Sequence, residues 1–349
     1  MSNDTAETSS YIDDITEQPA ALRRQADAPL PAALRDIDLR DHDRIVLTGM
    51  GSSDYAAVPI ERALAAMGLP VVRIDAGQLL DVPERVTNRT LVWATSQSGR
   101  SGEVAALADR LTGRCKPGLT IATTDDTTSP LAGMADIVLE LHSGPEATVS
   151  TKSYLNTLAA QHRALATMTG GSVDAVDEDI RRIADEVAEL LAEWPVADAF
   201  AEQAWNAPRA RFGYIGIGDD AATALTGALI TKESSKVPVE GFVGGAFRHG
   251  PYELAGPGLT AVLFGPGGQD DAFLPGLARD LARSGATVMT IGPRAYDGTG
   301  LLATPNRSSA LARLAVGSVR TQLLTLAFAK ATGEVAGRFR FGQKVTAAL

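Results

Sequence analysis

The chain contains the same local pattern twice: a short apolar stretch that ends in glycine, with a second glycine two residues later. RIVLTG occupies residues 44–49 and RFGYIG occupies residues 211–216, and the second glycines are Gly51 and Gly218. Short apolar stretches bounded by glycine are typical of strands buried on both faces of a sheet. Because the two copies lie 167 residues apart, they indicate the repetition of a whole domain and not the short period of a solenoid.

Each copy opens a series of alternating strands and helices. In the first half, strands are predicted at residues 44–49, 71–75, 90–96, 119–124 and 136–141, and helices at 51–68, 102–111 and 150–168. In the second half, strands are predicted at 211–216, 259–264 and 287–291, with an alanine-rich helix after the first of them. Strands that alternate with helices form parallel βαβ units. The sequence therefore predicts an α/β protein of two tandem αβα domains with parallel sheets, related by internal duplication.

The rest of the chain divides around these two domains. A polar lead and further helices are predicted for residues 1–40, and an acidic amphipathic connector for residues 171–205, which include DEDIRRIADEVAELLAEW. The predicted boundaries are then 1–40 for the lead, 41–170 for the first domain, 171–205 for the connector, 206–335 for the second domain and 336–349 for the tail.

Composition and charge exclude several classes of partner. The net charge of −10 opposes binding to the phosphate backbone of nucleic acid, and 5% aromatic residues offer few stacking platforms. No apolar stretch reaches the roughly 18 residues of a membrane span, and the polar N-terminus lacks the features of a secretory signal. The lone Cys115 excludes an intramolecular disulfide and a cysteine zinc cluster. We therefore expect a cytoplasmic protein without a membrane or nucleic-acid partner.

Two hydroxyl-rich loops follow predicted strands and precede predicted helices. One contains Gly51, Ser52 and Ser53, and the other is Ser96-Gln97-Ser98-Gly99-Arg100-Ser101. Backbone N–H groups at a helix start, a tight glycine turn and serine hydroxyls together suit a phosphate group. A single serine in such a place is more often a helix N-cap, but three serines in SQSGRS favour phosphate. The third glycine of a dinucleotide fingerprint is absent, because position 54 is Asp.

Two further residues are candidates for proton transfer. Glu233 lies in an otherwise apolar, small-residue helix, where an unpaired carboxylate has a raised pKa and can act as a general base. The structural alternative is a salt bridge to Lys232 or Lys236. His249 is held between Arg248 and Gly250-Pro251, and its alternative is a capping or surface histidine. No metal-binding histidine spacing occurs, so a metal is not indicated.

At this point the chain resembles a known family, the double SIS (sugar isomerase) proteins. More narrowly, it is similar to the isomerase half of glucosamine-6-phosphate synthase and to the deaminases and deglycases built on that half. The resemblance is carried by residues 11–24 with their Glu-Gln-Pro, by SQSG at 96–99, by Ser-Thr-Lys at 150–152, by Glu233 and His249-Gly-Pro, and by Lys344 near the C-terminus. The order of these five motifs matches over residues 11–349.

The resemblance implies flavodoxin-like domains, a role for each site residue and an oligomeric state. Ser53, Ser96, Gln97, Ser98 and Ser101 would hold the phosphate of the sugar, and Ser150 would touch the sugar. Glu233 would move a proton between C1 and C2, and His249, donated by the neighbouring subunit of a homodimer, would open the ring. Lys344, in a tail that reaches the active site, would meet the open-chain carbonyl, with a Schiff base as one form of that contact. The implied function is a cofactor-free phosphosugar isomerase, or an amino-sugar-6-phosphate isomerase or deaminase, acting on a substrate such as glucosamine 6-phosphate or fructose 6-phosphate.

Three departures from the synthase qualify that resemblance. The chain starts Met1-Ser2 without a glutaminase domain, so no glutaminase activity is expected. Ile230 stands where the synthase has a lysine before the catalytic glutamate, and Arg100 stands where it has an acidic residue. Arg100 is a candidate contact for an anionic or bulkier substituent, or alternatively a solvated arginine at a helix start. Two other functions stay open: a non-catalytic sugar-phosphate-binding regulator and a plain phosphoglucose or phosphomannose isomerase.

Overall fold

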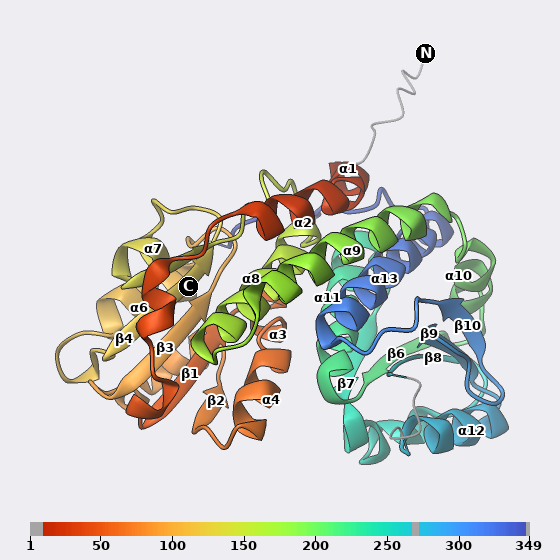
Figure 1. Ribbon diagram of the computed structural model, residues 1–349. Helices are drawn as coiled ribbons and strands as arrows, with labels where there is room; N and C mark the ends of the chain where they lie inside the picture. The colour runs from red at the N-terminus through yellow and green to blue at the C-terminus, as the bar shows by residue number, and fades with distance from the viewer. Residues whose placement is uncertain (1–9, 267–271, 347–349) are drawn as a thin grey trace.

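The computed structural model describes residues 10–266 and 272–346 and contains two parallel sheets that lie side by side (Figure 1). Residues 1–9 of the predicted polar lead and residues 347–349 of the predicted tail lie outside the described residues. Every strand pairing within the two sheets is parallel, as the alternation of strands and helices predicts.

The first sheet has the strand order β2-β1-β3-β4-β5. Its strands are β1 Arg44–Gly49, β2 Val71–Arg73, β3 Thr90–Thr95, β4 Leu119–Thr124 and β5 Ile137–Glu140. Its helices are α3 Ser52–Tyr55, α4 Val58–Ala66, α5 Ala76–Asp81, α6 Gly102–Arg110, α7 Pro130–Met134 and α8 Lys152–Met168. Buried apolar side chains cover both faces, including Ile45, Leu47 and Trp93 on one face and Val46, Val92 and Ala94 on the other.

The second sheet has the strand order β10-β9-β8-β6-β7. Its strands are β6 Arg211–Gly216, β7 Val239–Val243, β8 Leu259–Phe264, β9 Thr287–Gly292 and β10 Gly300–Ala303. Its helices are α11 Ala221–Ser235, α12 Leu274–Ser284 and α13 Ala310–Thr332. Numbered within its own half, each sheet has the order 2-1-3-4-5 of flavodoxin-like folds, which agrees with an internal duplication.

A layer of helices joins the two halves. The helices α1 Ser10–Thr16, α2 Gln18–Asp27, α9 Val173–Ala192 and α10 Asp198–Trp205 complete the set. Figure 1 shows α9 and α13 running between the two sheets, with α2 across α9. A shared core of buried residues on α2, α8, α9 and α13 includes Leu22, Leu155, Ile183, Val187 and Val316. The two halves are therefore packed through one continuous apolar layer.

Prolines explain where the helices differ from the prediction. The helix predicted over residues 51–68 is interrupted after Tyr55, and α4 begins again at Val58 with Pro59 in its first turn. Pro59 has no N–H to continue the preceding helix, and its fixed φ suits a helix start. Among the helices predicted within residues 1–40, α1 likewise ends at Thr16, shortly before Pro19, and α2 ends at Asp27 ahead of Pro29 and Pro31.

Several helices and strands were not predicted: α5, α7, β7, α12, β10 and α13. Four of them, α5, α7, β7 and β10, are short. The helix α12 does carry amphipathic spacing, with Leu274, Leu277 and Leu281 buried, and α13 is buried along most of its length. Within the described ranges, none of the helices combines the length and the hydropathy needed to cross a bilayer.

Candidate active site

The two hydroxyl-rich loops meet at the carboxyl ends of neighbouring strands. Gly49, the last residue of β1, is in register with Thr95, the last residue of β3. In this strand order the chain leaves β1 toward β2 and leaves β3 toward β4, in opposite directions, and ligands of open α/β sheets bind between two such strands. The fold therefore places both candidate phosphate loops at the expected ligand-binding edge.

The serines of the second loop are not used as helix caps. Ser101 occupies the N-cap position of α6, but its side chain caps no backbone N–H and lies 3.4 Å from the hydroxyl of Ser96. Ser96 Oγ accepts a hydrogen bond from Gly99 N at 3.1 Å, which tightens the turn. The N-cap of α3 is Gly51, with φ +54, so Ser52 and Ser53 lie in the first turn. The hydroxyl groups of Ser52, Ser53 and Ser101 are thus not used for capping and can converge on a ligand.

Gly99 is required for the shape of this loop. Its φ is +60, and a Cβ built on it would lie 2.0 Å from the hydroxyl oxygen of Ser129. No side chain fits in that space, because real Cβ contacts do not come below about 3 Å. The loop can therefore pass close to Ser129 only with glycine at this position.

The helix α11 brings Glu233 from the second half of the chain to these loops. Leu229, one turn earlier, packs so near the first loop that a Cβ on Gly51 would lie 3.2 Å from its methyl carbon. Burial raises the pKa of Glu233 to about 7, and Lys344, the strongest of the nearby opposing charges, lowers that pKa only in part. No ion pair joins the Glu233 carboxylate to another of the described side chains; Lys236 donates instead to the backbone oxygen of Glu233.

The loops, Glu233 and the C-terminal tail line one hollow of about 320 Å³. From the predicted site the lining contains Gly51, Ser52, Ser53, Ser96, Gln97, Ser98, Ser101, Ser150, Glu233 and Lys344. Ten of the twelve residues predicted from the sequence are thus brought together. The volume is of the order of a small ligand site.

The tail crosses from α13 to the first sheet and forms a wall of the hollow. Phe339, Gln343, Val345 and Thr346 line it together with Lys344. The backbone oxygen of Thr346 accepts a hydrogen bond of 2.8 Å from the N–H of Gly102, at the start of α6. The side chain of Lys344 forms an ion pair with Glu146, with 2.5 Å between Nζ and Oε2.

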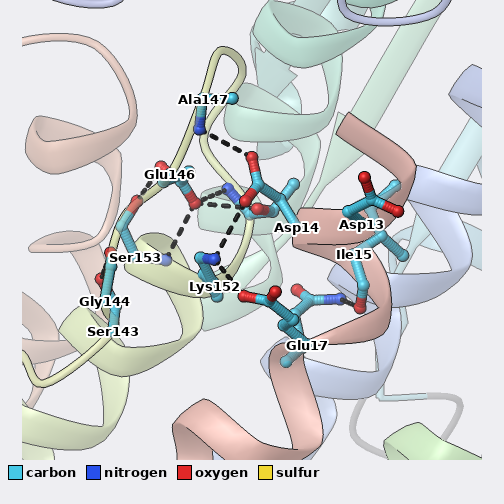
Figure 2. A network of polar contacts seen from close by, with 12 residues as sticks. Asp13, Asp14, Ile15, Glu17, Ser143, Gly144, Glu146, Ala147, Lys152 and Ser153 are labelled. Carbon is cyan, nitrogen blue, oxygen red and sulfur yellow. Dashed lines mark hydrogen bonds and ion pairs between the residues drawn. The ribbon is translucent and has the colours of Figure 1, made fainter. Parts of the chain in front are cut away.

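Glu146 was missed by the sequence reasoning, although it stands four residues before Ser150. Its side chain is fully buried, and its carboxylate accepts hydrogen bonds from both the N–H and the hydroxyl of Thr151 and of Ser153, at 2.6–3.1 Å (Figure 2). Burial alone would raise the pKa of Glu146, but Lys344 and the donors of Ser153 lower it below its ordinary value. The carboxylate is therefore held in its charged form.

Lys152 of the Ser-Thr-Lys motif is turned away from the hollow. Its side chain is 2% exposed and lies between Asp14, at 2.9 Å, and Glu17, both from the N-terminal helices (Figure 2). Burial would lower the pKa of Lys152, but the bonds to Glu17 and Asp14 raise it overall. Asp14 also accepts the N–H of Ala147 at 2.8 Å, so this cluster supports the loop that carries Glu146.

Two predicted residues do not line the hollow. His249 is exposed at the end of a 3-10 turn after β7, on the second half of the chain. Arg100 pairs with Asp126 at 2.7 Å and lines a larger neighbouring hollow of about 660 Å³, which shares Gln97, Ser98 and Lys344 with the first. Arg100 therefore lies beside the phosphate loop without entering its hollow.

The corresponding loop of the second sheet carries acidic side chains in place of hydroxyl groups. After Gly218 it carries Asp219 and Asp220 where the first loop has Ser52 and Ser53. Asp219 pairs with Arg62 at 2.8 Å, and both aspartates lie within 4 Å of Arg313. Among the residues that the structure describes, no group of three or more His, Cys, Asp or Glu side chains could hold a metal ion.

Comparison with known proteins places the chain in a family. Residues 38–167 match the SIS domain. The chain is 31% identical over 288 residues to the glutamine–fructose-6-phosphate aminotransferase (isomerizing) of Pyrococcus horikoshii, and the match covers 78% of this chain. It covers 46% of that protein, so this chain spans about half the length of its relative.

Solved structures share the whole two-sheet architecture. The C-terminal domain of the glucosamine–fructose-6-phosphate aminotransferase of Francisella tularensis superposes with a TM-score of 0.84 at 18% identity, covering 95% of this chain and 99% of that one. The glucosamine-6-phosphate deaminase of Thermotoga maritima gives 0.76 at 22% identity, covering 97% and 99%. At these identities the likeness concerns the fold. The chain is therefore an SIS-domain protein, with an SIS domain at residues 38–167 in the first of two tandem α/β domains.

Proposed function

We propose that this protein is a phosphosugar aldose–ketose isomerase, or an amino-sugar-6-phosphate isomerase or deaminase, acting on a hexose 6-phosphate such as glucosamine 6-phosphate or fructose 6-phosphate. One observation carries the proposal: a single hollow joins two anion-binding loops to the buried carboxylate of Glu233. The activities named for the relatives, an isomerizing aminotransferase and a glucosamine-6-phosphate deaminase, agree with it.

The loops would hold the phosphate. Ser53, Ser96, Ser98 and Ser101 supply hydroxyl donors, Gln97 supplies an amide, and the starts of α3 and α6 supply N–H groups, with Gly51 and Ser52 in the first loop. Ser150, on the opposite wall, would bind a sugar hydroxyl. Fixing the substrate through the phosphate orients the carbons at its other end.

Glu233 would be the proton carrier. Its carboxylate removes the proton on C2 of the open-chain aldose, and the electron pair moves into the C1–C2 bond while the carbonyl oxygen gains a proton. The carboxylic acid then returns its proton to C1 and the C2 hydroxyl loses one, which leaves the ketose. A pKa of about 7 suits both halves of this exchange near neutral pH.

Lys344 would reach the open-chain carbonyl from the tail, and His249 would open the ring. Because His249 lies outside the hollow of its own chain, we infer that the functional unit is a homodimer in which the partner donates this histidine. The proposal includes a first domain at residues 41–170, a second domain at 206–335 and a C-terminal tail at 336–349. It also includes a cytoplasmic location.

The decisive experiment measures two reactions in parallel. Ammonia release from glucosamine 6-phosphate and interconversion of glucose 6-phosphate with fructose 6-phosphate are each compared between the native protein and Glu233→Gln. Either activity, lost in the variant while thermal stabilisation by the substrate persists, supports the proposal and selects the reaction. Stabilisation by phosphosugars without either activity would instead indicate a binding protein, and no response at all would contradict the assignment of the hollow.

A further inference from the structure

The ion pair between Lys344 and Glu146 connects the C-terminal tail to the loop before α8. Glu146 is rigidly placed: its side chain is fully buried, and four donors from Thr151 and Ser153 fix the carboxylate at the entry to α8. Lys344 belongs to a segment without helix or strand, in which Phe341 is 99% exposed. The buried carboxylate of Glu146 therefore binds a tail segment that has no secondary structure to hold it in place.

Few other contacts fix this part of the tail. From Gln343 to Thr346, the described polar contacts are the Lys344–Glu146 pair and the bond from Gly102 N to Thr346 O. The same four residues line the hollow. Loss of the ion pair would leave that wall attached at a single backbone hydrogen bond.

We propose that Glu146 is a positioning residue, whose buried carboxylate fixes the ammonium group of Lys344 and thereby holds the C-terminal tail as a wall of the phosphosugar hollow. Glu146 itself faces the lysine and the backbone of α8, so it acts through Lys344. The effect on catalysis rests on the proposed function, whereas the anchoring of the tail does not.

Limited proteolysis tests the anchoring without an activity assay. Trypsin cuts after Lys344 only when that side chain is free, and intact-mass measurement follows the loss of residues 345–349. We expect Glu146→Gln to be cut after Lys344 at least tenfold faster than the native chain, because a neutral amide does not replace a buried charge pair. Glu140→Gln, which changes an exposed carboxylate on β5, is the matched control and should be cut at the native rate. Equal rates in Glu146→Gln and the native chain overturn the proposal.

A variant of Lys344 tests the same ion pair without changing the buried surroundings of Glu146. Lys344→Met breaks the pair from the tail side and should speed cleavage after Arg340, while Lys344→Arg, which keeps the charge, should remain protected. Unchanged cleavage after Arg340 in Lys344→Met overturns the anchoring.

Kinetics then separate positioning from a general structural effect. Glu146→Gln should lower kcat/KM roughly tenfold to a hundredfold, mostly through kcat, since the phosphate loops are untouched. In a Lys344→Met background the same substitution should have no further effect. A further loss in that background shows that Glu146 acts independently of the lysine and overturns the proposal. If the protein has neither proposed activity, kcat and KM cannot be measured. The proteolysis experiment then decides by itself whether Glu146 anchors the tail.

Discussion

Gly227 of α11 packs against Thr321 of α13 so closely that a Cβ on the glycine would lie 2.7 Å from the Thr321 methyl carbon. Glu233 is six residues further along the same helix, about 9 Å in axial rise. The path of α11, and with it the position of the proposed base, is therefore set by a contact between two buried helices of the second half.

Gly227→Ala tests that contact. The added methyl group should destabilise the fold by about 1–3 kcal/mol, as overpacking of a core does, and should lower kcat by displacing Glu233. Thr321→Ser removes the opposing methyl group but keeps the hydroxyl that donates to Gly317 O at 2.8 Å, so it should restore both properties in the double variant. Thermal unfolding and steady-state kinetics of the four proteins measure the coupling. Additive effects in the double variant would contradict it.

Activity should depend on a group with a pKa of about 7. Because Glu233 must be ionised to accept a proton, kcat/KM should fall as the pH drops below 7. The same shift affects stability. The folded pKa lies above the unfolded value of 4.5, so the stability contributed by the protonated form is present below pH 4.5 and is lost as the pH rises through 7. Glu233→Gln should therefore raise Tm at pH 8 by roughly 1–2 °C, the change expected for about 1 kcal/mol in a chain of this length, and much less at pH 4.5. A lower Tm at pH 8 would show that the carboxylate is not a buried, unpaired charge.

Ser101→Ala distinguishes a ligand-binding hydroxyl from a helix cap. Because Ser101 caps no backbone N–H, the variant should keep the native Tm while KM for the phosphosugar rises roughly tenfold or more. Ser172→Ala is the matched control: Ser172 does cap α9, at 3.2 Å from Ala175 N, so it should lose about 1 kcal/mol of stability with KM unchanged. A lower Tm with native KM in Ser101→Ala would assign the hydroxyl to structure.

The proposed donation of His249 across an interface predicts complementation. Glu233→Gln and His249→Ala should each be inactive alone. Mixed by denaturation and refolding, they should recover about one quarter of native activity, because random pairing makes half of the dimers mixed and each mixed dimer has one intact site. No recovery would place His249 in the site of its own chain or outside catalysis.

Most of the architecture follows from local sequence patterns. Strands such as 44–49, 119–124 and 259–264 are buried on both faces, so continuous apolar runs bounded by glycine identify them, and the structure confirms these bounds. The prolines decide the differences: Pro59 divides a helix that the apolar spacing alone predicts as continuous. The short edge strand β10 has only one buried residue, Leu302, and carries no such pattern.

The site was predicted less completely because its parts come from distant segments. The loops after β1 and β3 could be found, since the rule that ligands bind at carboxyl ends of parallel strands applies to sequence directly. Glu146 could not be found in the same way, because its importance depends on Lys344, 198 residues away, and on a loop held by Asp14. Arg100 was predicted at the phosphate loop on sequence adjacency alone, and its ion pair with Asp126 turns it into the neighbouring hollow.

The loops that follow β1 and β6 occupy matching places in the two sheets, but their side chains differ in chemical type. Where the first half presents hydroxyls at the tip of β1, the second presents Asp219 and Asp220 at the tip of β6, already neutralised by arginines of both halves. The two copies thus contribute different parts: the first carries the proposed phosphate loops, and the second supplies a helix and a tail that complete the same hollow, so the proposed active site needs both halves.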